Sequence, residues 1–255
     1  MSLRALTYPL AVTCGTLVVI AAWVPFADLD QVSALAVVAL GVLGYTGYQM
    51  ALAFGVLPSG AATRLAEIGR GEVAAPLDET GGSGIAGHRS ESGGVAPNRR
   101  EAVGRPGGRG IATGRRVRQQ HRLVSRSFLE ISVGERTVWQ PVFYEPALST
   151  LTPTDLDITP RSISAGSTRF FPSGRARSTE PPGKLVDNPT RPADPPAFTP
   201  TRRLILDAQS TVAAPFAGLL WVYVMNGGLP AFIAATTVAA ATATWLSAIR
   251  GSDPS

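Results

Sequence analysis

The chain has 255 residues, of which 45% are hydrophobic and 16% charged, and its formal net charge is +5. These averages hide a strong segregation, because residues 8–57 carry only two charges, Asp28 and Asp30, and residues 210–249 carry none. Such uncharged stretches exclude a single soluble globular domain, in which charged and apolar positions would alternate along every helix. The single cysteine, Cys14, excludes a disulfide framework and a cysteine-based metal site.

Two pairs of uncharged stretches are long enough to cross a membrane. Residues 7–26 form the first, and residues 32–57 follow after the short turn ADLD. A helix rises about 1.5 Å per residue, so about 20 apolar residues span a hydrocarbon core of roughly 30 Å. Residues 211–225 and 229–249 form the second pair, whose first member is short unless it begins within LILDAQS. We therefore predict four transmembrane helices in two hairpins, residues 7–57 and residues 204–250.

The basic residues predict how these helices are oriented. Of 23 basic residues, 19 lie between positions 60 and 201, and Arg202 and Arg203 directly precede the third stretch. The turn at residues 27–31 has two acids and no base, and the turn around Asn226 is uncharged. Positively charged loops stay in the cytoplasm. We therefore expect a multi-pass protein of the inner (plasma) membrane, with both termini and the central insert cytoplasmic.

Small residues on the second stretch indicate a helix-packing face. Gly47, Ala51 and Gly55 recur at intervals of four, where helix backbones can approach closely. They are candidate contacts for a partner, and ordinary packing within the four-helix unit is the alternative. No ionisable residue lies at the centre of a predicted span, which argues against an autonomous transporter or pump. The pair Asp28 and Asp30 fits turn chemistry better than catalysis.

The insert opens with residues 58–121, a predicted juxtamembrane helix followed by a flexible linker. Ser59 is a suitable N-cap, and Leu65 and Ile68 share one face of a helix that we expect along the membrane surface. Residues 79–114 contain too much Gly and Arg to bury a core. The stretch GGSGIAGHR there matches G-x-G-x-x-G, but no strand precedes it and no helix follows. We expect no dinucleotide site and no cofactor.

Arginine is concentrated at the end of this segment, in RRVRQQHR. We expect Arg115, Arg116 and Arg118, together with Arg202 and Arg203, to contact anionic lipid headgroups, which attract arginines close to a membrane. Nucleic acid is a less favoured partner, because no aromatic residues interleave with the arginines and no folded nucleic-acid motif is present. A solvated linker end is the alternative interpretation.

Residues 122–174 predict a small β-rich cytoplasmic domain. SFLEISV and RTVWQPVFYE alternate apolar and polar positions around Gly134-Glu135, as in a β-hairpin. DLDIT and STRFF predict two further short strands, and prolines such as Pro141 restrict these strands to edges or bends. Residues 175–203 form a Pro-rich linker. The expected core of the domain comprises Phe128, Leu129, Ile131, Val133, Trp139, Val142, Phe143, Leu148, Leu156, Ile158 and Phe170.

Three aromatic residues of the hairpin, Trp139, Phe143 and Tyr144, are candidate contacts for a partner, with core packing as the alternative. Both histidines, His88 and His121, lie in or beside the predicted linker. A histidine-based dyad or metal site is therefore hard to assemble from this sequence. We name no catalytic residue and expect no metal.

The whole layout resembles small actinobacterial membrane proteins, in particular the lipid-uptake coordinator of mycobacteria (LucA). The features that carry this resemblance are the paired spans at each end, the Arg-dominated insert and the stretch WQPVFYEPAL. The resemblance implies a non-enzymatic accessory factor that binds and stabilises multi-subunit importers of fatty acids and sterols. It assigns no functional residues.

The sequence thus predicts a membrane α-helical fold with a small β-rich cytoplasmic insert and disordered linkers. The preferred function is an accessory or scaffold protein whose partners are the membrane and other membrane-protein subunits. One alternative is a membrane-embedded enzyme that modifies lipids or glycans. Another is a membrane-tethered regulator that binds anionic lipid through its Arg-rich segment.

Overall fold

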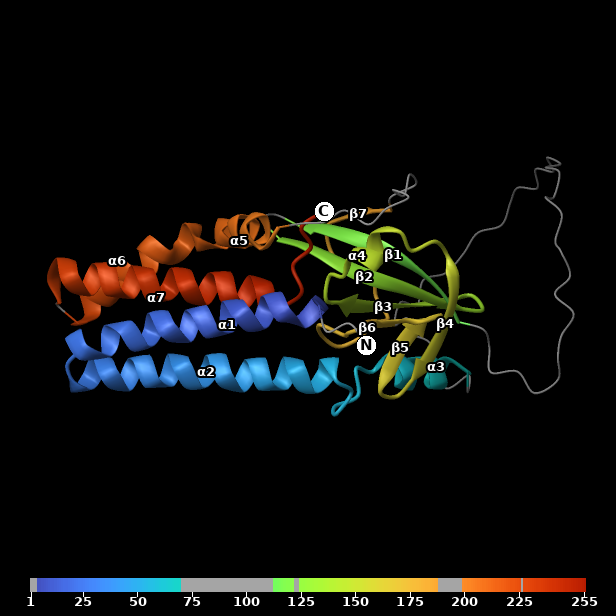
Figure 1. Ribbon diagram of the computed structural model, residues 1–255, viewed down its shortest axis with the longest axis horizontal. Helices are drawn as coiled ribbons and strands as arrows, with labels where there is room; N and C mark the ends of the chain where they lie inside the picture. Colours follow the sequence, from blue (N-terminus) through green and yellow to red (C-terminus); the bar gives the residue numbers. More distant parts are fainter. Residues whose placement is uncertain (1–3, 70–111, 122–123, 188–198, 226) are drawn as a thin grey trace, which may run out of the picture.

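The computed structural model describes residues 4–69, 112–121, 124–187, 199–225 and 227–255. A bundle of long helices and a curled antiparallel sheet lie end to end (Figure 1). The first and last described residues both lie at the junction between these two parts. The Gly-rich stretch at residues 81–89, most of the predicted flexible linker, His88 and residues 188–198 lie outside the described residues.

Four helical stretches are long and apolar enough to cross a membrane, which confirms the predicted number of such helices. The first is α1 (Arg4–Trp23) with the short 3₁₀ helix η1 (Val24–Phe26), and the second is α2 (Leu29–Ala53). Asp28 caps α2, because its side chain accepts a hydrogen bond from the Gln31 backbone N–H at 2.8 Å. The other two are α5 (Pro200–Ala208), η2 (Gln209–Ala213) and α6 (Ala214–Met225), taken together, and α7 (Gly228–Ile249).

The third stretch begins earlier than its hydrophobic run, at Pro200. Thr199 caps this helix by accepting a hydrogen bond from the Arg202 backbone N–H at 3.3 Å. Pro215 lacks an N–H and cannot bond to the Thr211 carbonyl, so the chain tightens into the 3₁₀ turn η2 before α6. Residues 200–203, which the sequence placed in the Pro-rich linker, therefore form the start of this helix, and Arg203 and Asp207 lie in its first turns.

The helix α7 is the centre of the bundle, since it packs against α1, α5 and α6 and also touches α2. It lies close to α6 at Gly218, where an added Cβ would collide with Thr236 Oγ1 and lie 3.1 Å from the Phe232 carbonyl. The predicted burial of the Ala- and Thr-rich fourth span holds only in part, because its buried residues lie from Val238 onward, whereas Leu229 and Ile233 are exposed.

Gly218→Ala is expected to lower the melting temperature of the detergent-solubilised chain, because the methyl group forces α6 away from α7. Gly41→Ala is the matched control, since Gly41 lies on α2 and a methyl group added there would have nothing within 4 Å. Both Gly→Ala substitutions raise helix propensity by up to about 1 kcal/mol. The collision at residue 218 is therefore the only expected cause of a difference between the two melting temperatures. Equal melting temperatures for the two variants would disprove the close contact.

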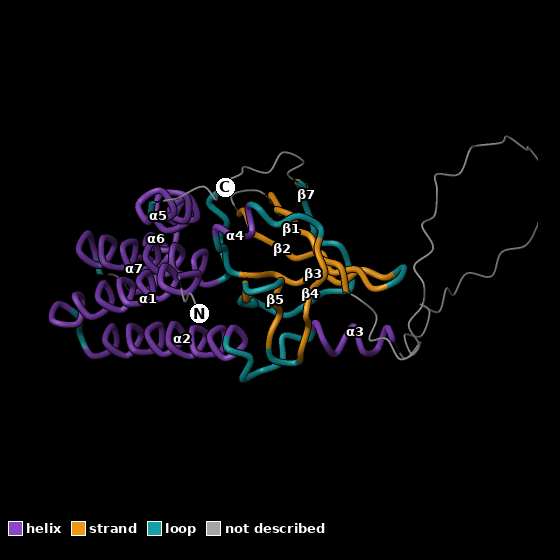
Figure 2. The backbone as a smooth tube through the Cα atoms, turned by 45° about the vertical axis from the view of Figure 1, so that its right-hand side comes forward, coloured by secondary structure: helices purple, strands orange, loops and turns teal. Residues whose placement is uncertain are grey.

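The sheet has seven strands, all antiparallel, in the order β3-β2-β1-β4-β5-β6, with β7 on the same edge of β1 as β4 (Figure 2). The short strand β4 pairs with residues 112–114 and β7 with residues 118–120, which curls the sheet around its centre. A short helix, α4 (Pro146–Ser149), joins β3 to β4. The strands are β1 (Ala112–His121), β2 (Val124–Val133), β3 (Arg136–Val142), β4 (Thr154–Thr159), β5 (Ser162–Ala165), β6 (Thr168–Phe170) and β7 (Lys184–Val186).

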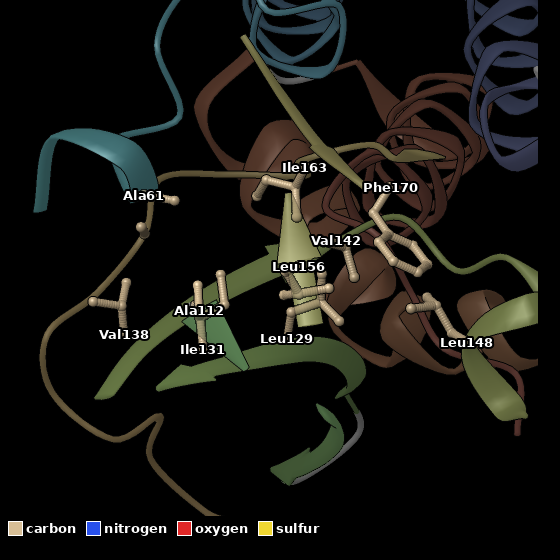
Figure 3. Close-up of a cluster of buried hydrophobic side chains, with 11 residues drawn as sticks. Ala61, Ala112, Leu129, Ile131, Val138, Val142, Leu148, Leu156, Ile163 and Phe170 are labelled. Atoms are coloured by element: carbon tan, nitrogen blue, oxygen red, sulfur yellow. The ribbon is translucent and has the colours of Figure 1, made fainter. Parts of the chain in front are cut away.

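The predicted hairpin is confirmed as β2 and β3, and the two further predicted strands are β4 and β6. Pro141 lies on β3, which is an edge strand, as a residue without a backbone donor requires. Figure 3 shows the core between the sheet and its covering segments. Of the expected core, Val133 and Ile158 are only partly buried, and the other nine residues are buried.

Three features of the insert differ from the sequence prediction. The helix α3 (Ala61–Gly69) packs against β3 and β4 and buries Ala61 completely, so it covers the sheet, whereas the sequence predicted a helix along the membrane surface. The sheet begins at Ala112, within the predicted flexible linker, because β1 is extended and paired on both edges. Strand β7 and the start of α5 occupy parts of the predicted Pro-rich linker.

Candidate functional site

The helices and the sheet are joined by residues 250–255, which follow α7 and enter the space between the two parts. The Asp253 N–H donates to the Ser125 carbonyl at 2.9 Å, and Ser252 forms a bridge with Arg126 on β2. Gly251 has a φ of 79°, and a Cβ there would lie 2.6 Å from Ser173 Oγ, so only glycine fits this turn. The segment therefore has a specified path and is not a loose tail.

Asp253 forms a buried ion pair with Arg116 on β1, at 2.6 Å. The side chain of Asp253 is 0% exposed and that of Arg116 is 6% exposed. The Ser127 hydroxyl donates to the same carboxylate oxygen at 2.6 Å, and Ser255 donates to the other oxygen from its N–H and its hydroxyl. A charge this deeply buried is tolerated only when it is paired and hydrogen-bonded, as it is here.

The environment of Asp253 holds its carboxyl in the ionised form. Burial alone would raise the pKa of Asp253. The charge of Arg116 and the hydrogen bonds from Ser127 and Ser255 outweigh burial, so the pKa of Asp253 is lowered below its ordinary value. The pair is therefore charged at neutral pH.

Asp207 is the second buried carboxylate and it connects three helices. It is 2% exposed. It accepts hydrogen bonds from Tyr8 of α1 at 2.5 Å, from Ser247 of α7 at 2.7 Å and from Ser252 at 3.0 Å. The Arg203 guanidinium stacks 4.0 Å from the Tyr8 ring. Because Ser252 and Asp253 are neighbours, the two carboxylates fix one short segment to both the bundle and the sheet. We call Tyr8, Arg116, Asp207, Ser252 and Asp253 the carboxylate joint.

The secondary structure explains how these side chains meet. Residues alternate between the faces of a strand, so Arg116 points to the same side of β1 as Gly114 and Arg118, toward the segment 250–255. Its guanidinium lies 5.8 Å from the Tyr144 ring. Ser247 lies in the last turn of α7 and Asp207 near the end of α5, at the same end of the bundle. Only one sequence signal marked this site: Asp207 is the only acidic residue between Asp194 and Asp253.

A second feature, an apolar groove of about 630 Å³, lies between the helices and follows α7 from Pro230 to Leu246. Its floor is one face of α7, where Ala231, Ala235, Ala239 and Ala243 recur at intervals of four. Trp23 and Trp221 also line it. Small residues at this spacing permit close approach of an apolar neighbour.

The predicted small-residue face of α2 is present at Gly47 and Ala51 but not at Gly55. Gly47 is exposed, with nothing within 4 Å of an added Cβ, and Ala51 is half-buried. Gly55 lies beyond the end of α2 with a φ of 75°, where an added Cβ would collide with the Arg161 carbonyl. Its inclusion in the face was wrong, because the glycine serves a turn packed against the β4–β5 connection. Gly41 and Gly44, which continue this face toward the start of α2, are exposed, as Gly47 is.

The predicted aromatic contact surface lies inside the protein. Trp139 is 9% exposed, Phe143 1% and Tyr144 3%. Phe143 packs with Phe171 against the start of α1 and the end of α2. These three residues therefore pack within the sheet domain and against the helices. This is the core-packing alternative to a contact surface for a partner.

The predicted lipid-binding arginines are divided among different environments. Arg115 forms ion pairs with Glu130 at 2.8 Å and Asp187 at 2.9 Å. Arg116 is buried in the carboxylate joint, and Arg118 donates to Ser255. These three arginines are therefore side chains of a central strand and not of a free basic segment. Arg202 and Arg203 do lie at the junction, Arg202 exposed and Arg203 half-buried.

In the described part of the chain, no three His, Cys, Asp or Glu side chains are grouped closely enough to hold a metal ion. The Tyr8 hydroxyl and the Asp207 carboxylate form a hydrogen-bonded pair of the kind that can act in acid–base chemistry. The hydrogen bonds to this carboxylate come from Tyr8, Ser247 and Ser252, which connect α5 to α1, to α7 and to the segment after α7. The chain matches no protein-family model, no curated protein and no solved structure.

Proposed function

We propose that this protein is a non-enzymatic accessory or scaffold subunit of the plasma membrane, which binds and stabilises a multi-subunit membrane complex. The observation that carries this proposal is the carboxylate joint. It fixes the sheet to three of the four apolar helical stretches, because two buried carboxylates hold one segment between them. A scaffold needs such rigidity, because it must present membrane and cytoplasmic surfaces to its partners in one fixed geometry.

The distribution of aromatic residues supports insertion of the bundle in a bilayer. Residues 32–48 of α2 carry no charge and number 17, which lies within the range of about 17–25 apolar residues that span a hydrocarbon core. Trp23, Phe26 and Trp221 lie toward one end of the bundle, and Tyr45 and Tyr48 toward the other. Tyrosine and tryptophan are enriched at both membrane–water interfaces.

The arginines support a cytoplasmic position for the sheet. Arg202, Arg203 and Arg250 lie at the end of the bundle that meets the sheet, and the opposite turns carry only Asp28 and Asp30. By the positive-inside rule, this distribution supports a cytoplasmic position for the sheet.

Impermeant maleimide labelling tests this orientation in a Cys14→Ser background. A cysteine at exposed Asp30 should react in intact cells, and one at exposed Ser178 should react only after the cells are opened. Reaction of the Ser178 position in intact cells would reverse the orientation and remove the sheet from the cytoplasm.

The exposed glycine strip of α2, consisting of Gly41, Gly44 and Gly47, is the proposed contact for a partner helix. All three are exposed, and an added Cβ would meet no atom within 4 Å. Since lipid gives helices no hydrophobic reason to associate, close backbone approach at small residues is the main source of affinity. The resemblance noted in the sequence suggests a fatty-acid or sterol importer as the complex.

Affinity purification of the tagged chain in mild detergent tests the proposed function. We expect other membrane subunits to co-elute in stoichiometric amounts, and Gly44→Leu with Gly47→Leu to reduce them several-fold. The matched control is Gly15→Leu, an exposed glycine on α1 that likewise has nothing within 4 Å. Purification of the chain alone, with turnover of a lipid substrate, would support the enzyme alternative and overturn the scaffold.

A further inference from the structure

A second set of arginines gathers on the α2 side of the junction. Arg126 lies on β2, Arg175 and Arg177 follow β6, and Arg250 caps the end of α7. Arg175 Nε donates to the Tyr48 hydroxyl at 3.1 Å, and Arg250 Nε donates to the Tyr45 hydroxyl at 3.4 Å. The rings of Tyr45 and Tyr48 are 6.3 Å apart between centroids. We call these four arginines and two tyrosines the arginine–tyrosine cluster.

The four guanidinium groups of this cluster have no carboxylate partner among the described residues. The three ion pairs of that part of the chain are formed by Arg115 and Arg116. Arg126 Nε is buried and makes no hydrogen bond within the described structure. Desolvation, and then the charges of Arg250 and Arg177, lower the pKa of Arg126 below its ordinary value. Like charges thus lie close together here without compensation, which favours an anion.

The position of the cluster specifies the kind of anion. Arg250 directly follows the last residue of α7, and Tyr45 and Tyr48 lie where α2 leaves the stretch that matches the hydrocarbon thickness. On α2, exposed apolar side chains such as Val37 and Leu40 lie farther along the helix, on the bilayer side of the tyrosines. A ligand that matches both features has an anionic head and an apolar tail.

We propose that the arginine–tyrosine cluster binds the phosphate group of an anionic glycerophospholipid in the leaflet beside the sheet. This inference rests on the proposed membrane placement. Planar guanidinium groups pair with phosphate oxygens through two parallel hydrogen bonds, and Arg175, Arg177 and Arg250 are exposed to receive them. None of these residues belongs to the Arg-rich stretch of β1, whose arginines are already engaged with acids and serines of the protein.

Native mass spectrometry of the full chain in a neutral detergent tests the proposal. Phosphatidylglycerol and phosphatidylcholine with the same acyl chains are added at equal concentration, and the lipids retained by each chain are counted. We expect a preference of at least about tenfold for phosphatidylglycerol, since several arginines near the phosphate each contribute. Arg175→Gln with Arg177→Gln and Arg250→Gln should reduce this preference to about twofold or less.

The matched control removes three exposed charges elsewhere, by Arg64→Gln, Arg136→Gln and Lys184→Gln. Equal melting temperatures establish that both variants are folded. Equal loss of preference in both, or none in the native chain, overturns the proposal. Displacement of the lipid by inorganic phosphate at the same concentration would assign the site to a soluble phosphate and overturn the lipid assignment. Extraction of the chain by alkaline carbonate would instead refute the membrane placement itself.

Discussion

Asp253→Ala is expected to destabilise the folded chain by about 3–5 kcal/mol, the cost of leaving one member of a buried ion pair unpaired. The variant leaves the Arg116 guanidinium buried against Ser127 and Ser149 with no opposing charge. It also removes the acceptor of the Ser127 hydroxyl. Thermal unfolding in detergent, followed by circular dichroism, measures the loss.

Asp187→Ala is the matched control for this prediction. Asp187 also pairs with an arginine of β1, but its side chain is 38% exposed, and such pairs contribute at most about 1 kcal/mol. Replacing both buried partners, by Arg116→Met with Asp253→Leu, should cost less than Asp253→Ala, because no charge remains unpaired. An Asp253→Ala chain as stable as the Asp187→Ala chain would contradict the importance of the joint.

Acid is expected to weaken the same ion pair. The pKa of Asp253 is lowered in the folded chain, whereas an unfolded aspartate has a pKa of about 3.9. The stabilisation is therefore complete above about pH 4 and is lost as the pH falls through the lower folded value. The stability difference between the native chain and Asp253→Ala should shrink below about pH 4. A difference that stays constant down to about pH 2 would contradict this titration.

The helices and the central hairpin were predictable because each depends on local sequence. A run of uncharged residues long enough to cross a bilayer needs no knowledge of its neighbours, and the alternation of Leu129, Ile131 and Val133 specifies a strand by itself. Pro141 likewise placed β3 at an edge through its missing donor. These predictions hold because one physical constraint acts within one segment.

The carboxylate joint was not predictable in this way, because its partners are distant in sequence. Arg116 and Asp253 are separated by 137 positions, and β1 reads as ATGRRVRQQH, which has no clear alternation. The charge of Arg116 suggested a solvated segment. Arg116 is buried because the segment that follows α7 covers it and supplies the carboxylate of Asp253. Gly55 failed for a related reason, since its spacing matched a helix that had already ended at Ala53.

Asp207→Leu is expected to cost on the order of 3 kcal/mol and to loosen the sheet from the bundle. The substitution removes the acceptor of three hydroxyl groups, those of Tyr8, Ser247 and Ser252, and each buried donor left unpaired costs about 1–3 kcal/mol before water or neighbours compensate. Tyr8→Phe is the matched control, because it removes one of these donors and leaves the carboxylate with two, for a cost of about 1–2 kcal/mol.

The two variants also separate a structural role for Asp207 from its role in the scaffold. The apolar helices of the Asp207→Leu chain should still insert in the membrane, because their hydrophobic length is unchanged. The segment 250–255 would then lose the hydrogen bond from Ser252 to the bundle and keep its contacts with the sheet. Limited proteolysis should cleave near Gly251 faster than in the Tyr8→Phe chain, and co-purification of partner subunits should fall in proportion to that cleavage. Unchanged partner binding in a chain that has lost protection near Gly251 would show that the partners do not require a fixed sheet, and the scaffold function would then rest on the helices alone.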